Sequence, residues 1–208
     1  TKGWSWQTYW LMQASVCWLI LPLIVAYVTI PQLQQVLAEA PSSAMTSSFF
    51  WGMLYGIGGT AFGLAIRYIG FSLTYAISVG ISCVLGTLLP PLYEGKLATI
   101  LQGSGGNVIV TGIAAGAIGI ILCGWAGRLK EKDYEDQQRE KSGYSFSIGI
   151  ALCILAGVLS AFYGFALFRG QPIADVAAKY GAGYFQGNII YIFSNTGAFV
   201  TTALYCIY

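Results

Sequence analysis

Six long apolar runs without any Asp, Glu, Lys or Arg decide what this chain can fold into. They cover residues 10–30, 49–66, 71–93, 108–126, 144–168 and 184–208. A transmembrane helix needs about 20 mostly apolar residues, whereas the strands of a membrane barrel alternate between apolar and polar positions. The runs do not alternate. We therefore predict an all-α, polytopic transmembrane helix bundle that forms a single domain over residues 1–208.

The residue types that are scarce or missing exclude several function classes. Only 9% of the residues are charged, against about 25% in an average soluble protein, so most of the surface is expected to face lipid. The net charge of +2 comes without a basic cluster, and histidine is absent. We therefore expect no enzyme, no metal, no cofactor and no nucleic-acid partner. The cysteines lie in apolar runs without CxxC spacing and are interpreted as small buried residues: Cys17, Cys83, Cys123, Cys153 and Cys206.

The basic residues between the runs predict the orientation in the membrane. Lys2, Arg67 and the segment RLKEKDYEDQQREK (128–141) carry seven of the ten Lys and Arg residues and lie on one side. Cytoplasmic loops carry an excess of Lys and Arg. We therefore expect the N-terminal side to be cytoplasmic, together with a solvated charged loop over residues 128–143 that could include a short amphipathic helix.

Small residues and prolines predict how the helices pack and bend. Glycines four positions apart let helix backbones approach closely in lipid. Pro22 lies in the middle of the first run and is expected to kink it, whereas Pro90 and Pro91 are expected to end the third. The glycine-rich segment 103–107 is interpreted as a turn. The predicted helix-packing glycines are Gly52, Gly56, Gly59, Gly63, Gly112 and Gly116.

Neutral polar side chains are the remaining candidates for function. Asn188, Tyr191 and Asn195 are spaced three and four apart, which would place them on one helical face. Amides, hydroxyls and aromatic rings could contact a neutral polyol, but interhelical hydrogen bonding of about 0.6 kcal/mol per contact would also explain them. Both interpretations stay open. The candidate substrate contacts are Gln13, Tyr55, Asn188, Tyr191 and Asn195.

Several segments resemble the L-rhamnose–proton symporter family of the drug/metabolite transporter superfamily. The most specific is WGMLYGIGGTAFGLAIRYIGFSLTYAISVGISCVLGTLLPPL (51–92), which carries matching glycines and the Arg67–Tyr68 pair. KGWSWQTYW (2–10), GIAAGAIGIILCGWAGRLKEKD (112–133) and GVLSAFYGFAL (157–167) are also similar to it. The resemblance implies a protein of ten helices in two inverted repeats around a central site. This chain would be a fragment that supplies the second to seventh helices.

The function implied by this resemblance is import of L-rhamnose or a related deoxysugar together with protons. The setting would be a bacterial inner membrane, with a neutral sugar, the proton and the lipid bilayer as partners and alternating access as the mechanism. No carboxylate lies within the six runs, so the proton site is expected outside this fragment. Two alternatives stay open: another transporter of the superfamily, such as an exporter of metabolites or drugs, and a membrane scaffold or sensor. The oligomeric state is not predicted.

Overall fold

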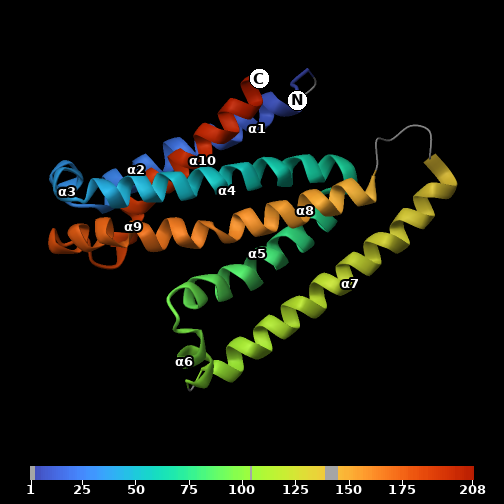
Figure 1. The fold of residues 1–208 in the computed structure, drawn as a ribbon. Coiled ribbons are helices and arrows are strands. Elements are labelled where there is room, and N and C mark those ends of the chain that lie inside the picture. The colour runs from blue at the N-terminus through green and yellow to red at the C-terminus, as the bar shows by residue number, and fades with distance from the viewer. Residues whose placement is uncertain (1–2, 104, 139–144) are drawn as a thin grey trace. The chain divides into compact units, whose positions relative to one another are not determined.

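A computed structural model describes residues 3–103, 105–138 and 145–208, and every regular element in these ranges is helical (Figure 1). Six stretches are long and apolar enough to cross a membrane, so the all-α transmembrane prediction is confirmed. In chain order the elements are α1 (Trp6–Ala14), the π-helix η1 (Ser15–Ile20), α2 (Leu21–Thr29), α3 (Leu33–Glu39), α4 (Ser42–Ile69), α5 (Phe71–Tyr93), α6 (Leu97–Gln102), α7 (Gly106–Gln138), α8 (Phe146–Ala161), α9 (Tyr163–Lys179), the 3₁₀-helix η2 (Gly183–Ile189) and α10 (Ile190–Ile207).

The contacts divide the chain into two compact units. Unit 1 comprises Thr1–Ile57 and Phe162–Tyr208, and unit 2 comprises Gly58–Ala161. The chain passes between the units within α4 and again at the turn between α8 and α9. Unit 1 is therefore built from two sequence segments that lie more than 100 residues apart.

In unit 1, the segment α1–η1–α2 runs antiparallel to α10. The rings of Trp6 and Tyr205 meet edge to face at one end, and the Asn188 side chain donates a hydrogen bond to Thr29 at the other end. The N- and C-terminal ends of the chain accordingly lie at the same end of this unit (Figure 1). The neutral polar residues along α1 and α10 can therefore be ordered along one common axis.

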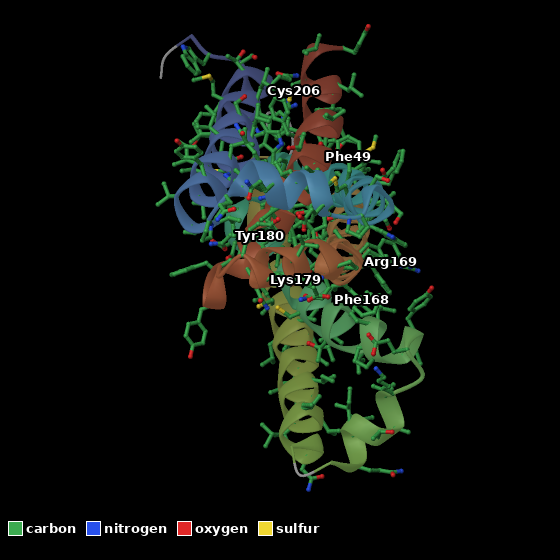
Figure 2. The ribbon with its side chains drawn as sticks, turned by 90° about the vertical axis from the view of Figure 1, so that its left-hand side faces the viewer. Phe49, Phe168, Arg169, Lys179, Tyr180 and Cys206 are labelled. Atoms are coloured by element: carbon green, nitrogen blue, oxygen red, sulfur yellow. The ribbon has the colours of Figure 1, made fainter. Side chains whose placement is uncertain are left out.

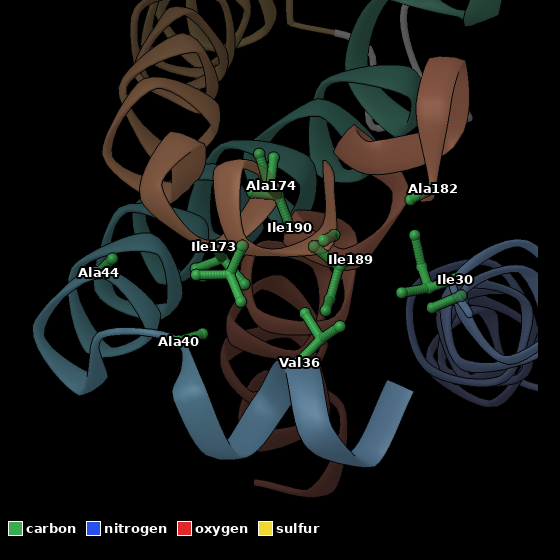
Figure 3. Close-up of a cluster of buried hydrophobic side chains, with 12 residues drawn as sticks. Ile30, Val36, Ala40, Ala44, Ile173, Ala174, Ala182, Ile189 and Ile190 are labelled. Atoms are coloured by element: carbon green, nitrogen blue, oxygen red, sulfur yellow. The ribbon is translucent and has the colours of Figure 1, made fainter. Parts of the chain in front are cut away.

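The end of unit 1 that lies away from the two termini is closed by an apolar core. Val36 is fully buried on the short helix α3 and projects toward Ile189 (Figure 3). Ile173 of α9 is also fully buried in this core. Further alanines and isoleucines of this core come from α4, α9, α10 and the turns that follow α2, α3 and α9: Ile30, Ala40, Ala44, Ala174, Ala182 and Ile190.

Pro22 is accommodated without an abrupt end to the first span. The helix widens into the π-helix η1 before the proline, and Leu21 donates its N–H to the carbonyl of Val16. Pro22 then occupies the first turn of α2, where a missing N–H is tolerated. Pro22 was expected to kink this span. The π-helix η1 is the local distortion found next to it.

Two helices run further than the apolar runs indicated. Helix α7 continues to Gln138, so residues 128–138 extend a long helix, whereas a loop with at most a short helix was expected; residues 139–143 lie outside the described range. The fifth span likewise continues beyond the apolar run, through α9 to Lys179. Helix α9 extends this far because it is amphipathic at its end: Ile173 is buried, whereas Asp175 is exposed.

The extension of α9 brings a carboxylate into the fifth span, although none lies within the six apolar runs. Asp175 belongs to the span Phe146–Lys179, and so does Arg169. The span has 34 residues, whereas about 20 helical residues are enough to cross the roughly 30 Å of a bilayer core. The charged end of α9, where Arg169, Lys179 and Tyr180 lie, is remote from Cys206 on α10 (Figure 2).

Unit 2 is a smaller apolar assembly. Helix α5 packs against both α7 and α8, and the core gathers Ala65, Ile69, Ile77 and Cys153. Gly70, with φ of 82°, ends α4 in a conformation that favours glycine and turns the chain directly into α5. The expected turn at 103–107 ends by Gly106, where α7 begins, and Ser104 lies outside the described residues.

Candidate functional site

A group of polar and aromatic side chains, here named the Tyr163 cluster, lies inside unit 1. The Tyr163 hydroxyl donates a hydrogen bond to Asn195 Oδ1 at 2.5 Å and lies 3.3 Å from Ser194 Oγ. The Tyr55 ring lies 4.5 Å from the Tyr163 ring, measured between centroids, and the Trp18 ring lies 5.7 Å from Tyr55. The cluster therefore joins η1, α4, α9 and α10.

Glycine contacts explain how α4 and α10 come close enough to form the cluster. A Cβ added at Gly52 would lie 2.0 Å from the carbonyl oxygen of Ser194, and one added at Gly197 would lie 2.1 Å from that of Phe49. Neither position can hold a larger residue unless the backbones separate. Gly56 lies against Ala198 in the same way. The cluster therefore depends on glycines that themselves carry no chemistry.

The polypeptide is interrupted beside the cluster. A turn at Phe162 separates α8 from α9, and Tyr163 is the first residue of α9. Interrupted helices are a common way to build substrate sites inside transporters, because they free backbone groups and redirect side chains at membrane depth. The interruption therefore lies directly before Tyr163, the residue around which the cluster is built.

The structure brings together some of the predicted site residues and separates others. Tyr55 and Asn195 lie in the Tyr163 cluster, and Tyr191 is half-buried one turn before Asn195 on α10. Asn188 lies in η2 and donates instead to Thr29 at 3.1 Å. Gln13 lies on α1, where its Oε1 is buried without a hydrogen-bond partner among the described residues.

Sequence reasoning missed three members of the cluster. Tyr163 lies in the apolar run 144–168, but the spacing of residues along one helix cannot show that it meets Asn195 on another helix. Ser194 directly precedes Asn195 and is fully buried. Trp18 gave no signal in the sequence, since its role depends on meeting Tyr55 of another helix.

The chemistry of the cluster is that of neutral recognition. It combines hydroxyl groups, a carboxamide and aromatic rings, which together donate and accept hydrogen bonds and offer apolar faces. No group of three His, Cys, Asp or Glu residues that could hold a metal occurs among the described residues. The arrangement suits an uncharged molecule that carries several hydroxyl groups.

The fold and the cluster together define a multi-pass membrane protein with an uncharged polar site between its helices. Comparison with known proteins identifies the family. Residues 1–208 match the family described as L-rhamnose-proton symport protein (RhaT), and the chain belongs to that family. This is a family of transporters rather than of enzymes.

Named relatives agree with this family assignment. The chain is 32% identical over 180 residues to an L-rhamnose-proton symporter of Yersinia pestis bv. Antiqua (strain Antiqua), over 86% of this chain and 52% of the relative. The same identity and coverage hold for an L-rhamnose-proton symporter of Yersinia pseudotuberculosis serotype O:3 (strain YPIII). The chain thus spans about half the length of the curated relatives it matches. No solved structure matches it significantly.

Proposed function

We propose that the protein to which this chain belongs imports L-rhamnose or a related deoxysugar with protons across a bacterial inner membrane. The family and the names of its relatives support this proposal. The observation within the chain that carries it is the Tyr163–Asn195 hydrogen bond beside the Tyr55 ring, an uncharged polar site within transmembrane helices. The N-terminal side of unit 1 would face the cytoplasm.

In the proposed site, the Tyr163 cluster supplies complementary groups to a sugar. Asn195 accepts the hydrogen bond from the Tyr163 hydroxyl through Oδ1, which leaves its amide N–H groups to donate to sugar oxygens. The Tyr163 oxygen can still accept a hydrogen bond from a sugar hydroxyl. Tyr55 would cover the apolar face of the sugar ring, and Tyr191 lies one turn away on the same helix. Absence of charge would avoid the cost of burying an unpaired ion in lipid.

The proton site is proposed to lie in the part of the protein beyond this chain. Within the described spans the one carboxylate is that of Asp175, which accepts a hydrogen bond from Gln171 at 3.1 Å on the exposed side of α9. It does not belong to the Tyr163 cluster. Alternating access would then couple protonation elsewhere to exposure of the sugar site.

Uptake of labelled L-rhamnose by the full-length protein tests the proposal. Cells that lack their own rhamnose transporter should gain uptake that a protonophore abolishes. Asn195→Leu should reduce uptake at least tenfold, because it removes the amide and leaves Tyr163 without its acceptor. Asn107→Leu, the same change at an exposed position of α7, is the matched control. Absence of rhamnose uptake would refute the transport proposal, whereas unchanged kinetics of Asn195→Leu would refute only the site.

A further inference from the structure

Two buried polar atoms on α1 have no hydrogen-bond partner among the described residues. They are Nε1 of Trp10, a donor, and Oε1 of Gln13, an acceptor. Leaving such atoms unpaired costs about 1–3 kcal/mol each, and more where no water is present to replace the missing partner. A spacing of three residues places them on one face of the helix, one turn apart.

This face of α1 is directed inward and held in place. Ala14, next to Gln13, is fully buried, and α1 packs against α10. The ring of Trp10 stacks on that of Trp6 at 5.4 Å with an interplanar angle of 14°, and Trp6 meets Tyr205 of α10. The ring contacts of Trp10 and Trp6 therefore favour the observed orientation of the Trp10 indole.

The antiparallel register of unit 1 places this pair apart from the Tyr163 cluster. Trp6 is level with Tyr205, and Trp18 contacts Tyr55 in the cluster. Trp10 and Gln13 lie between these two levels, five to eight residues before Trp18. At 1.5 Å per residue the separation along the axis is about 8 to 12 Å. The pair and the cluster thus lie at two different levels along the same segment, α1–η1.

We propose that Trp10 and Gln13 form a second sugar-binding station on the N-terminal side of the Tyr163 cluster. In this station the Trp10 N–H donates to one sugar oxygen, Gln13 Oε1 accepts from a sugar hydroxyl, and the stacked indoles cover the apolar ring face. The occupant is a neutral molecule with hydroxyl groups, since the station contains a donor, an acceptor and no charge. With the proposed orientation, the sugar reaches this station after it leaves the cluster toward the cytoplasm.

This inference rests on the proposed function and can be tested separately from it. Trp10→Phe keeps an aromatic ring but removes the N–H, and Gln13→Leu keeps the approximate volume but removes the acceptor. Trp4→Phe is the matched control, because Trp4 is half exposed ahead of α1. Purified full-length protein would be titrated with L-rhamnose and with its monodeoxy analogues, and uptake would be measured for the same variants.

Each station variant is expected to raise the KM for L-rhamnose roughly tenfold. One monodeoxy analogue should bind Trp10→Phe and the wild type equally, because the hydroxyl that Trp10 contacts is already missing from it. Equal losses for all analogues, an unchanged KM, or a loss of folded protein without a change in KM would overturn the station. If the wild type binds no L-rhamnose, the proposed function fails before any variant is compared. If Asn195→Leu impairs uptake and the station variants do not, only the station is refuted.

Discussion

The two units use similar apolar helices in different ways. Helices of unit 1 are joined by polar contacts, including Tyr163 to Asn195 and the Thr201 hydroxyl to the carbonyl of Met53. Unit 2 relies mainly on small residues against aliphatic ones, such as Gly149 against Ile69. Hydropathy alone does not separate these cases, because both units consist of spans with a positive mean hydropathy. The difference lies in which side chains meet across helices.

The grooves of unit 2 are also mainly apolar, in keeping with the apolar packing of its helices. One is lined by apolar side chains of α5, α7 and α8, among them Ile77, Ile120 and Ile150. Another, between α5 and α7, includes Gly112 and is also largely apolar. Such surfaces suit lipid or another helix but lack the donors and acceptors that a sugar needs. If the proposed function holds, substitutions in unit 1 should affect transport more strongly than those in unit 2.

The largest expected effect comes from filling the close contact between α4 and α10. In Gly52→Ala the new methyl group would overlap the backbone of Ser194, so α4 and α10 must separate and the Tyr163 cluster must open. Overpacking of this kind costs about 1–3 kcal/mol, and contact with backbone should place it at the upper end. Thermal unfolding of the purified full-length protein and rhamnose uptake should both decline.

The matched substitution in unit 2 is Gly112→Ala. A Cβ there meets no atom within 4 Å among the described residues, so Gly112 makes no close helix contact within this part of the chain. Since alanine favours helix by up to about 1 kcal/mol over glycine, stability should stay the same or rise slightly. Equal destabilisation by Gly52→Ala and Gly112→Ala would contradict the contrast between the units.

The next-largest effect is expected from removing a single tyrosine hydroxyl group, which can be compared between the two units. Tyr163→Phe removes the donor to Asn195 and should lower rhamnose uptake about tenfold, because a buried acceptor loses its partner. Tyr75→Phe makes the same chemical change in unit 2, where the ring packs on Phe71 and is half exposed. Its uptake should match the wild type. Comparable losses in both variants would place a functional tyrosine in unit 2 as well.

A smaller effect on stability is expected from breaking the hydrogen bond between η2 and α2 in unit 1. Asn188→Ala and Thr29→Val each remove one partner of a 3.1 Å hydrogen bond. A double-mutant cycle on unfolding free energy should give a coupling of about 0.6 kcal/mol, the average for such bonds in membrane proteins. If Asn188→Ala also raised the KM for rhamnose, Asn188 would belong to the sugar path as well as to the helix contact.

The sequence predicted the spans well because length and apolarity are local properties. The run 71–93 coincides with α5, and the others differ mainly at their ends. The amphipathic end of α9 was not predicted. It carries Asp175 and Lys179 on its exposed side, so its sequence is not a continuous apolar run. Tertiary burial of Ile173, rather than composition, makes that segment a continuous helix.

The site could be predicted only in part, because it depends on contacts between helices. Asn195 and Tyr55 were identified from their polarity or depth, but the residue that joins α9 to α10, Tyr163, lies in a different helix from Asn195. Spacing arguments also assume one continuous α-helix. Asn188 lies in a 3₁₀-helix, so the expected face from Asn188 to Asn195 is not a single α-helical face.

The smallest effect concerns the surface of unit 1, where Tyr180 donates a 2.6 Å hydrogen bond to Glu39. This bond, with minor desolvation and the charge of Glu39, raises the pKa of Tyr180 above its usual value. The neutral phenol is therefore favoured in the folded state, and its stabilisation is present below the unfolded pKa of about 10 and is lost as pH rises through the folded pKa. Glu39→Gln should return the Tyr180 titration, followed by NMR of labelled tyrosine, toward the ordinary value. A titration unchanged by Glu39→Gln would show that Glu39 does not set this pKa.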